Sequence, residues 1–490
     1  MSPNAHRWVF SACLLAHLVL LSGCPVGPTY ELPETAPGKA FGNQAQDEYD
    51  VKSVDQTWWQ QFRDPQLTQL MQLAVKNNYD LKAAEANLRQ SRALFLDAGL
   101  NLLPHINAHG NYSAIRRSFD ALNRRDFVPR DLNLYSLGFD SWWELDIWGR
   151  IRRNVQATEA EIESAEADRR YLTLTVIAEL ARNYFELRGH QNQMAVEQRN
   201  AANQKSTWDL TIARQEAGIG TDFDTQRAKA QYDTTLALIP PMDSLIHEDI
   251  HRISVLTGQI PSALLKTLTV PAPIPAAPAV IHLSKPADLL RRRPDIRAVE
   301  RNLASATARV GVAIADLFPR VTFVGSFNLE SNSLTGLAAP GTGAYNFGPR
   351  ITWPAFELGQ VYARIKAAEA QADIMLAEYQ QVVLNALEET ENALVVYDRL
   401  RDRQALLKTA AEASTRAYEV ANIRFEEGVE DFLNLLDTER RLLMDQREYA
   451  QSQTATAAAL ISIYKSLGGG WEVFQTPEDA QRPVEQVFTP

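Results

Sequence analysis

The chain has 490 residues, of which 45% are hydrophobic and 22% are charged. This composition is typical of a folded protein with large buried surfaces, and it excludes a disordered tail. The formal net charge of -11 argues against a nucleic-acid binder, because neutralising phosphates requires an excess of clustered lysine and arginine.

The N-terminus has the features of a secretory signal. Arg7 precedes an apolar run that ends at Leu21, and this run is too short to span a bilayer as a mature helix. Small residues separate the run from Cys24, where a signal peptidase would cut. We therefore predict that residues 1–23 form a signal peptide and that Cys24 begins the mature protein.

Cys24 ends the sequence Leu-Ser-Gly-Cys, which resembles the lipobox of bacterial lipoproteins. The resemblance implies that Cys24 carries a covalent lipid, which adds hydrophobic anchorage at a membrane. The alternative is a chance cysteine after an ordinary signal peptide. Cys13 lies in the removed segment, so the mature chain can form no intrachain disulfide. By analogy with lipoprotein sorting, the absence of Asp after Cys24, where Pro25 stands, favours delivery to the outer membrane.

The sequence contains an internal repeat of about 210 to 215 residues. A constant shift of 215 or 210 aligns Asp80, Glu85 and Leu103-Pro104 with Asp295, Glu300 and Phe318-Pro319; Tyr135, Gly138, Trp143 and Gly149 with Tyr345, Gly348, Trp353 and Gly359; and Arg214 and Gly218 with Arg424 and Gly428. Together with the N-terminal signal, the repeat predicts the organisation of the whole chain. Its parts are a signal peptide (1–23), a lipid-anchored N-terminal segment with a first equatorial helix region (24–79), a first copy (80–270), a Pro-rich extended connector (271–286), a second copy (287–470) and a C-terminal tail (471–490).

Each copy contains a very long helical stretch. No Gly or Pro occurs from Val361 to Glu427, and strong helix formers dominate, which predicts about 100 Å of helix. The first copy has apolar residues at alternating spacings of three and four, the pattern of a coiled-coil seam: Tyr171, Leu174, Ala178, Ala181 and Phe185. Gly218 and Gly428 then interrupt the helices, so each copy is expected to fold back as a helical hairpin. An ordinary long-helix bundle is the alternative.

Four segments of about ten residues alternate between apolar and polar side chains. The apolar positions are Ile106, Ala108 and Tyr112; Tyr135, Leu137, Phe139, Trp143 and Leu145; Val321, Phe323, Phe327 and Leu329; and Tyr345, Phe347, Ile351 and Trp353. This pattern is typical of membrane-spanning β-strands. Two half-buried soluble hairpins are the alternative.

The strand count predicts oligomerisation. No mature segment has about 18 consecutive apolar residues, so the chain could enter a bilayer only as strands of a closed barrel. Four strands cannot close a barrel, because bacterial barrels begin at eight. The chain is therefore expected to contribute its strands to a barrel shared with copies of itself, with outward loops at 116–131 and 331–344.

Several motifs together resemble one protein family over nearly the whole mature chain. They are Cys24-Pro25-Val26-Gly27-Pro28-Thr29-Tyr30; Trp58-Trp59 with Phe62-Arg63-Asp64-Pro65-Gln66-Leu67; Leu289-Leu290-Arg291-Arg292-Arg293-Pro294-Asp295-Ile296; and Leu467-Gly468-Gly469-Gly470-Trp471. The sequence resembles the NodT branch of TolC-like outer-membrane efflux lipoproteins. The resemblance implies a mixed α+β membrane protein, a homotrimer with a twelve-stranded β-barrel and a periplasmic α-helical barrel. It also implies a periplasmic adaptor, an inner-membrane pump of the resistance-nodulation-division type, and no cofactor besides the lipid on Cys24.

In that family the inner end of the helical tunnel is gated by carboxylates, which select by charge and constriction. The family's pattern, two acids three positions apart soon after a Gly, falls on Asn434 and Asp437, so only the second acid is present. The equivalent residues of the first copy are Asp224 and Arg227, which raises the hypothesis that Arg227 and Asp437 pair across a closed pore. Solvated surface charges are the alternative. The hairpin tips at Gly218 and Gly428 would contact the adaptor. Near the second tip the family's polar latch residues are replaced by Phe425 and Glu430, which leaves the latch chemistry open.

One motif suggests catalysis. His247-Glu248-Asp249-Ile250-His251 matches the H-E-x-x-H signature of zinc proteases, with both histidines on one helix face. Asp249 places a charge beside the general base, and Ser254 replaces the Gly of the longer signature. We therefore expect a non-enzymatic channel for passive exit of small molecules or drugs; a zinc hydrolase and a periplasmic coiled-coil scaffold without a pore are the alternatives.

Overall fold

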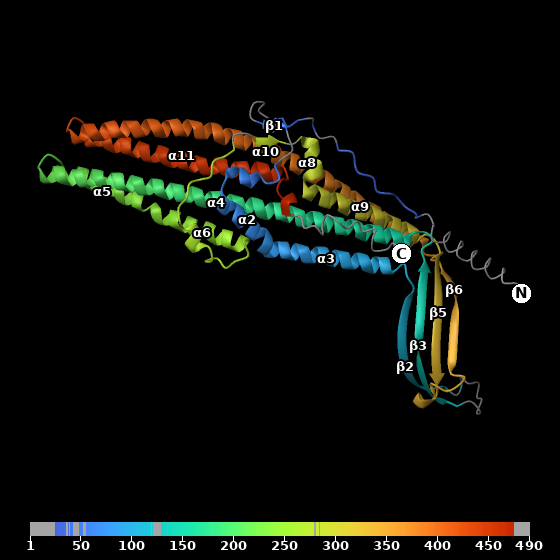
Figure 1. Cartoon of the computed structure of the whole chain (residues 1–490). Coiled ribbons are helices and arrows are strands. Elements are labelled where there is room, and N and C mark those ends of the chain that lie inside the picture. Colours follow the sequence, from blue (N-terminus) through green and yellow to red (C-terminus); the bar gives the residue numbers. More distant parts are fainter. Residues whose placement is uncertain are drawn as a thin grey trace. The chain divides into compact units, whose positions relative to one another are not determined.

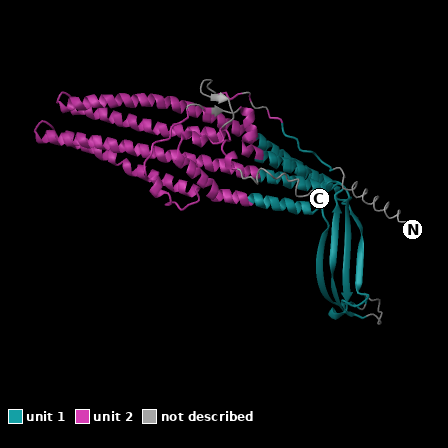
Figure 2. Cartoon of the chain, viewed as in Figure 1, with its two compact units in different colours: residues 1–33, 87–165, 298–380 teal, residues 34–86, 166–297, 381–490 magenta. Residues whose placement is uncertain are grey.

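The computed structural model describes residues 25–35, 38, 40–42, 49–51, 55–118, 120, 129–278, 281–283 and 285–474. The chain forms two compact units, each assembled from three separate stretches (Figure 2). Unit 1 comprises Met1–Pro33, Asn87–Ala165 and Ala298–Gln380, and unit 2 comprises Glu34–Ala86, Glu166–Arg297 and Gln381–Pro490. After Glu34, each boundary falls inside a helix, so the polypeptide passes between the units without leaving helical conformation.

The elements of Figure 1 have the following bounds: β1 (Tyr49–Val51), η1 (Trp58–Phe62), α2 (Pro65–Asn77), α3 (Tyr79–Leu100), β2 (His105–Arg116), β3 (Asp131–Leu145), α4 (Arg150–Glu216), α5 (Asp222–Leu236), α6 (Ile239–Leu256), α7 (Leu265–Leu268), β4 (Ile281–Leu283), α8 (Pro286–Arg292), α9 (Pro294–Ala315), β5 (Arg320–Ser331), η3 (Leu334–Gly336), β6 (Gly343–Thr352), α10 (Leu358–Glu426), α11 (Phe432–Ser466) and η4 (Glu472–Phe474). In this part of the chain, every helix is too short or too polar to cross a bilayer.

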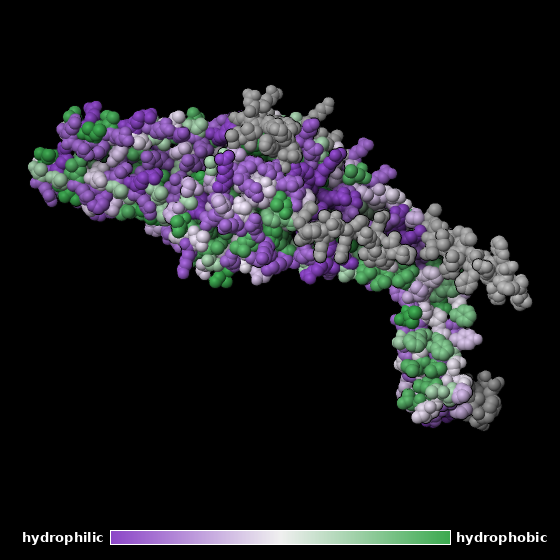
Figure 3. Space-filling view, in the orientation of Figure 1, coloured by the Kyte–Doolittle hydropathy of each residue, from purple (hydrophilic) through white to green (hydrophobic). Residues whose placement is uncertain are grey.

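The four predicted strands form one antiparallel sheet in unit 1, in the order β2-β3-β5-β6. The register places Phe139 opposite Phe327 and Phe327 opposite Tyr345, so the apolar positions of neighbouring strands share one face. Asp140 and Ser326 are paired on the other face, which is polar. Figure 3 shows hydrophobic side chains gathered over these strands. The alternation in the sequence therefore produces a two-faced sheet, as predicted.

The long helices are confirmed. α4 has 67 residues and α10 has 69, which corresponds to about 100 Å each. The return helices differ between the two halves of the chain, because α11 runs unbroken for 35 residues whereas Pro240 and Pro241 divide its counterpart into α5 and α6. The break has a physical cause: proline lacks the backbone N–H that a helix interior requires and is tolerated in the first turn of α6.

Several contacts occur twice, at corresponding positions of the two halves. The Trp143 Nε1–H donates to the Leu102 carbonyl at 2.9 Å, and the Trp353 Nε1–H donates to the Leu317 carbonyl at 3.0 Å. Each bond ties the end of the second strand of a half to the loop before its first strand.

A second repeated contact joins helix ends in unit 2. The Asn78 amide donates to the Leu256 carbonyl at 3.0 Å, and the Arg293 guanidinium donates to the Ser466 carbonyl at 3.1 Å. In both cases, the residue before a helix binds the last turn of the return helix of the same half, α6 or α11.

The Trp58-Trp59 motif and the glycine run at 468–470 meet in unit 2. Trp58 stacks on Tyr464 with a centroid distance of 4.9 Å, and its Nε1–H donates to the Gly469 carbonyl at 3.2 Å. Gly470 has a φ of +114°, and a Cβ there would lie 2.9 Å from the Trp58 Nε1. The glycine run before Trp471 therefore forms a close-fitting socket for the N-terminal tryptophan.

Candidate gate and docking site at the hairpin tips

Both hairpins turn through the same backbone motif. After α4, the Gly218 N–H donates to the Gln215 carbonyl at 2.9 Å and the Ile219 N–H to the Arg214 carbonyl at 3.0 Å. After α10, residues 428 and 429 make the equivalent bonds at 3.1 and 2.9 Å. Gly218 and Gly428 have φ values of +76° and +75°, which L side chains rarely adopt. Glycine therefore ends each long helix, as the sequence predicts.

Asp224 takes part in capping the helix that follows the first tip. The Thr221 hydroxyl accepts the Asp224 N–H at 3.2 Å and donates to the Asp224 carboxylate at 2.7 Å. The first of these bonds satisfies a backbone donor that the start of α5 would otherwise leave unpaired, and the second holds the hydroxyl in place. Arg227, one turn further, lies 5.2 Å from the centroid of the Phe223 ring.

Asn434 and Asp437, which the sequence predicts as gate residues, lie on the first two turns of α11. Asn434 and Asp437 are exposed, and the Asn434 amide donates to the Glu430 carboxylate at 2.7 Å. Their spacing of three residues places them on one side of the helix. Within the described part of a single chain, no ion pair joins Asp437 to Arg227. A pair between these residues would therefore have to form between copies.

The residues that depart from the family's latch pattern contribute to the tip itself. Phe425 is buried in an apolar cluster that joins α5, α10 and α11 and contains Ala228, Phe425, Phe432, Leu435 and Leu436. The Arg214 guanidinium lies 4.7 Å from the centroid of the Phe425 ring and donates to the Phe425 carbonyl at 3.1 Å. Glu430 forms an ion pair with Arg424 at 3.1 Å. We call the five buried residues the tip cluster; sequence reasoning missed it, although Phe425 and Phe432 flank Gly428.

Each tip also exposes two apolar side chains at equivalent positions. Ile219 and Val429, which follow the turn glycines, are 68% and 67% exposed. Phe223 and Leu433, four residues later, are exposed as well. Apolar groups at the same place in both hairpins form a recurrent surface that can bind an apolar partner.

The H-E-x-x-H motif lies on α6, and its side chains are not arranged as in a zinc protease. Asp249 is directed inward, where its carboxylate lies 2.7 Å from His190 Nδ1, and burial raises the pKa of Asp249. The His247 Nδ1 lies 2.8 Å from the Asp243 carbonyl, one turn earlier on the helix. Among the described residues, no three metal-binding side chains are grouped.

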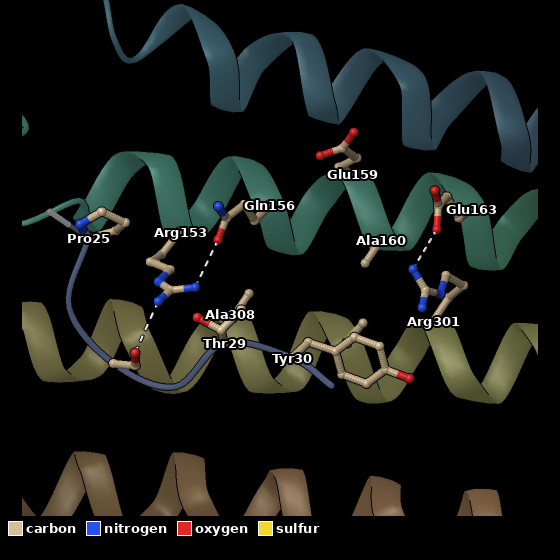
Figure 4. A pocket seen from close by; sticks show the side chains of 12 residues that line it. Pro25, Thr29, Tyr30, Arg153, Gln156, Glu159, Ala160, Glu163, Arg301 and Ala308 are labelled. Atoms are coloured by element: carbon tan, nitrogen blue, oxygen red, sulfur yellow. Dashed lines mark hydrogen bonds and ion pairs between the residues drawn. The ribbon is translucent and has the colours of Figure 1, made fainter. Parts of the chain in front are cut away.

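Residues 25–30 are fastened to the helices of unit 1 (Figure 4). The Arg153 guanidinium donates to the carbonyls of Val26 and Gly27, both at 3.0 Å. The Tyr30 hydroxyl donates to Glu300 at 2.5 Å, and burial together with this carboxylate raises the Tyr30 pKa. We call residues 25–30 the N-terminal strap; beside it lies a cavity of about 510 Å³. Cys24 itself lies outside the described residues.

The model of the outer membrane efflux protein family matches residues 70–259 and 286–469. The chain belongs to this family. It is 29% identical to nodulation protein T of Rhizobium leguminosarum bv. trifolii, over 92% of this chain and 96% of that one. It is 28% identical to the toluene efflux pump outer membrane protein TtgC of Pseudomonas putida, over 95% of this chain and 96% of that one.

Solved structures agree with this membership. The outer-membrane channel OprN is 40% identical, covers 92% of this chain and all of its own, and superposes with a TM-score of 0.85. The Campylobacter jejuni CmeC outer membrane channel is 22% identical with a TM-score of 0.83, covers 94% of this chain and 98% of its own, and shows the shared fold. The predicted NodT-type resemblance, the outer-membrane location and the non-enzymatic role in efflux are therefore confirmed. Nothing in the relatives favours the hydrolase or the scaffold.

Proposed function

We propose that this efflux protein forms the exit channel of a tripartite pump, through which small organic molecules or drugs pass passively from the periplasm to the exterior. The observation that carries the proposal is the two-faced sheet, because a soluble protein has no use for a band of exposed aromatic side chains such as Phe139, Phe327 and Phe347. By its name, the relative TtgC belongs to a toluene efflux pump, which supports apolar cargo.

The pore would be a twelve-stranded barrel shared by three chains. Strands β2 and β6 are the two edges of the sheet, so each has one side that pairs with no other strand of the described chain. Such edges cannot remain open in lipid, so the β6 of one chain would pair with the β2 of the next. Exposed apolar residues on α10, among them Leu384 and Leu406, support contacts between copies along the helices as well. The mass of the detergent-solubilised protein tests this: three chains are expected.

The paired contacts of Trp143 and Trp353, and of Asn78 and Arg293, support an origin by duplication, with copies at 80–270 and 287–470. Contacts at equivalent positions of the two halves are what a duplicated fold retains. The proposed connector at 271–286 would join the copies. It contains β4, which pairs with β1 from the N-terminal segment.

We further propose that Cys24 is acylated. The N-terminal strap supports this, because the Val26 N–H donates to the Trp148 carbonyl at 3.1 Å, three residues after β3 ends. A lipid on the residue before Pro25 would therefore start at the end of the sheet. The variant Cys24→Ser is expected to lose all incorporation of labelled fatty acid, whereas the wild type takes it up. Equal labelling of the two proteins would exclude this site.

The gate is proposed at Asn434 and Asp437 of α11 together with Asp224 and Arg227 of α5. In a ring of copies, Arg227 of one chain could pair with Asp437 of the next, since neither has an ion-pair partner within the described chain. The double variant Arg227→Ala/Asp437→Ala is then expected to raise single-channel conductance severalfold, because the closed constriction loses its cross-links. Unchanged conductance would show that these residues are surface charges. Replacing exposed Asp402 and Arg399, which pair on α10, provides the control.

The hairpin tips are the proposed docking site for a periplasmic adaptor, which in turn engages an inner-membrane pump of the resistance-nodulation-division type. The exposed apolar residues after Gly218 and Gly428 support this, because they face water unless a partner covers them. A trimer would present six such tips.

A further inference from the structure

The interface between the two hairpins of one chain is polar along much of its length. Helix α4 buries a row of polar side chains at alternating spacings of four and three: Gln193, Glu197, Asn200, Gln204, Thr207 and Thr211. These are the positions that carry apolar residues in an ordinary coiled coil. The spacing is that of a coiled-coil seam, but the side chains are polar instead of apolar. We call this row the polar seam.

The polar seam faces α11 in a constant antiparallel register. Asn192 donates to Gln453 at 3.1 Å, Arg447 binds Glu197 through two bonds at 2.6 and 3.2 Å, and Thr207 donates to Glu439 at 3.4 Å. The two hairpins are therefore held together here by polar contacts. Each such contact is worth little net free energy, because water replaces it when the surfaces separate.

Some polar atoms of the seam have no hydrogen-bond partner when α4 packs against α11. Among the described residues, Asn200 Nδ2 and both side-chain amide atoms of Gln204 are buried without a hydrogen-bond partner. Burying such groups unpaired costs free energy, which separation of α4 from α11 would release. These unpaired groups therefore destabilise the packed arrangement of α4 against α11.

Glu439 is a buried acid of α11 that faces the polar seam. It is 2% exposed, on the turn of α11 that follows Leu435 and Leu436 of the tip cluster. From α4 it faces Thr207, from α10 the hydroxyl of Tyr418, and on α11 it is flanked by buried Leu442. Burial raises the pKa of Glu439 to about 7, and the Thr207 hydrogen bond opposes this.

The basic residues that follow Glu439 do not neutralise it. Arg440 donates to Gln231 of α5 at 2.9 Å, and Arg441 pairs with Asp445 at 3.0 Å. No charged side chain contributes to the pKa shift of Glu439 within the described chain. Beyond the single hydrogen bond from Thr207, ionised Glu439 could be stabilised by water, which must enter between the hairpins.

We propose that Glu439 is a proton-controlled latch of the hairpin tips. Protonated Glu439 stays packed against the polar seam and keeps α11 against α4. Ionised Glu439 draws water between the helices, which loosens the tip cluster and lets α11 move away from α4. Asn434 and Asp437 lie on the same two turns of α11, so the latch would set the position of the proposed gate. This inference deepens the channel proposal and rests on it for its functional meaning.

The direction of the pH effect follows from the raised pKa. A hydrated carboxylate titrates near 4.5, whereas Glu439 in the packed state titrates near 7. The packed state is therefore fully favoured below about pH 4.5 and loses about tenfold in its equilibrium per pH unit until about pH 7. Above that value the effect levels off, because the carboxylate is ionised in both states.

Spin labels test the latch directly. Exposed Ser206 on α4 and exposed Met444 on α11 lie on either side of the polar seam, and the mature chain has no other free cysteine if Cys24 is acylated. In trimers of Ser206→Cys/Met444→Cys diluted with unlabelled chains, we expect the long-distance fraction to rise at least tenfold from pH 5 to pH 8. Adding Glu439→Gln, which cannot ionise, should fix the distribution at its pH 5 form.

The control is Glu448→Gln, which removes an exposed acid of α11 that pairs with Arg403. This variant should keep the full pH response. A wild-type distance that does not change with pH, or a Glu439→Gln variant that responds like the wild type, would overturn the latch. Conductance in planar bilayers is recorded on the same samples: a conducting protein without a distance change rejects the latch alone, whereas a distance change without conductance rejects the channel alone.

Discussion

Phe327→Arg is expected to abolish trimer assembly and outer-membrane insertion. Phe327 lies at the centre of the apolar face, in register with Phe139 on one side and Tyr345 on the other. A cationic side chain at the middle of the lipid-facing surface of a barrel costs about 2–4 kcal/mol, and the lost aromatic burial adds to it. Three copies multiply the cost. The yield of trimer from outer-membrane extracts and the drug susceptibility of the cells measure the effect.

The neighbouring residue supplies the matched control. Ser326 is paired with Asp140 and Asn346 on the polar face, which the proposed barrel turns toward its water-filled interior. Ser326→Arg should therefore leave assembly within about twofold of the wild type. If both variants assembled equally well, the apolar face would not contact lipid, and the barrel would be wrong.

Ile219→Asp/Val429→Asp is expected to abolish export while leaving the channel assembled. Both residues are exposed at the tips, so the substitutions remove no buried contact within the chain. Charges on an apolar docking surface must be desolvated when a partner binds, which costs several kcal/mol over six tips. Drug resistance should fall to that of cells without the protein, and cross-linking to the adaptor should be lost.

Position decides the result, so the control places the same charges elsewhere. Ser206→Asp/Thr409→Asp adds two acids at exposed sites further along the helices, and export should stay at the wild-type level. Normal export by the tip variant would show that the adaptor binds another surface. Loss of trimer in the tip variant would show that the tips serve assembly.

Local patterns in the sequence predicted the elements that local forces determine. Period-two alternation predicted the four strands of the sheet, and the absence of Gly and Pro predicted α10 to within three residues at its start and one at its end. Gly218 and Gly428 marked the tips because only glycine readily takes the left-handed conformation that ends each helix. These features depend on neighbours within one or two turns, so a single sequence reveals them.

Features that depend on contacts between distant residues were missed. The parallel pair of β1 and β4 joins residues that lie more than 200 positions apart, and each strand has only three residues, too few for a pattern. Pro240 and Pro241 mark the break between α5 and α6, although an unbroken return helix was predicted there. The socket of Trp58 emerges only when the glycine run lies beside it.

The candidate site was predicted in part. The sequence predicts that Gly218 and Gly428 end the long helices, but it does not predict the tip cluster or the polar seam. The residues of the seam, such as Gln204 and Thr207, are ordinary surface residues by type, and only their burial against α11 reveals their role. The roles assigned to Asn434, Asp437, Asp224 and Arg227 depend on how copies meet and stay predictions.

Ion current through size-separated protein in planar bilayers tests the central claim most directly, namely that one chain makes a pore only together with copies of itself. The account predicts discrete conductance steps from the fraction with the mass of three chains and none from the single-chain fraction. A conducting monomer, or a trimer that never conducts, would contradict it.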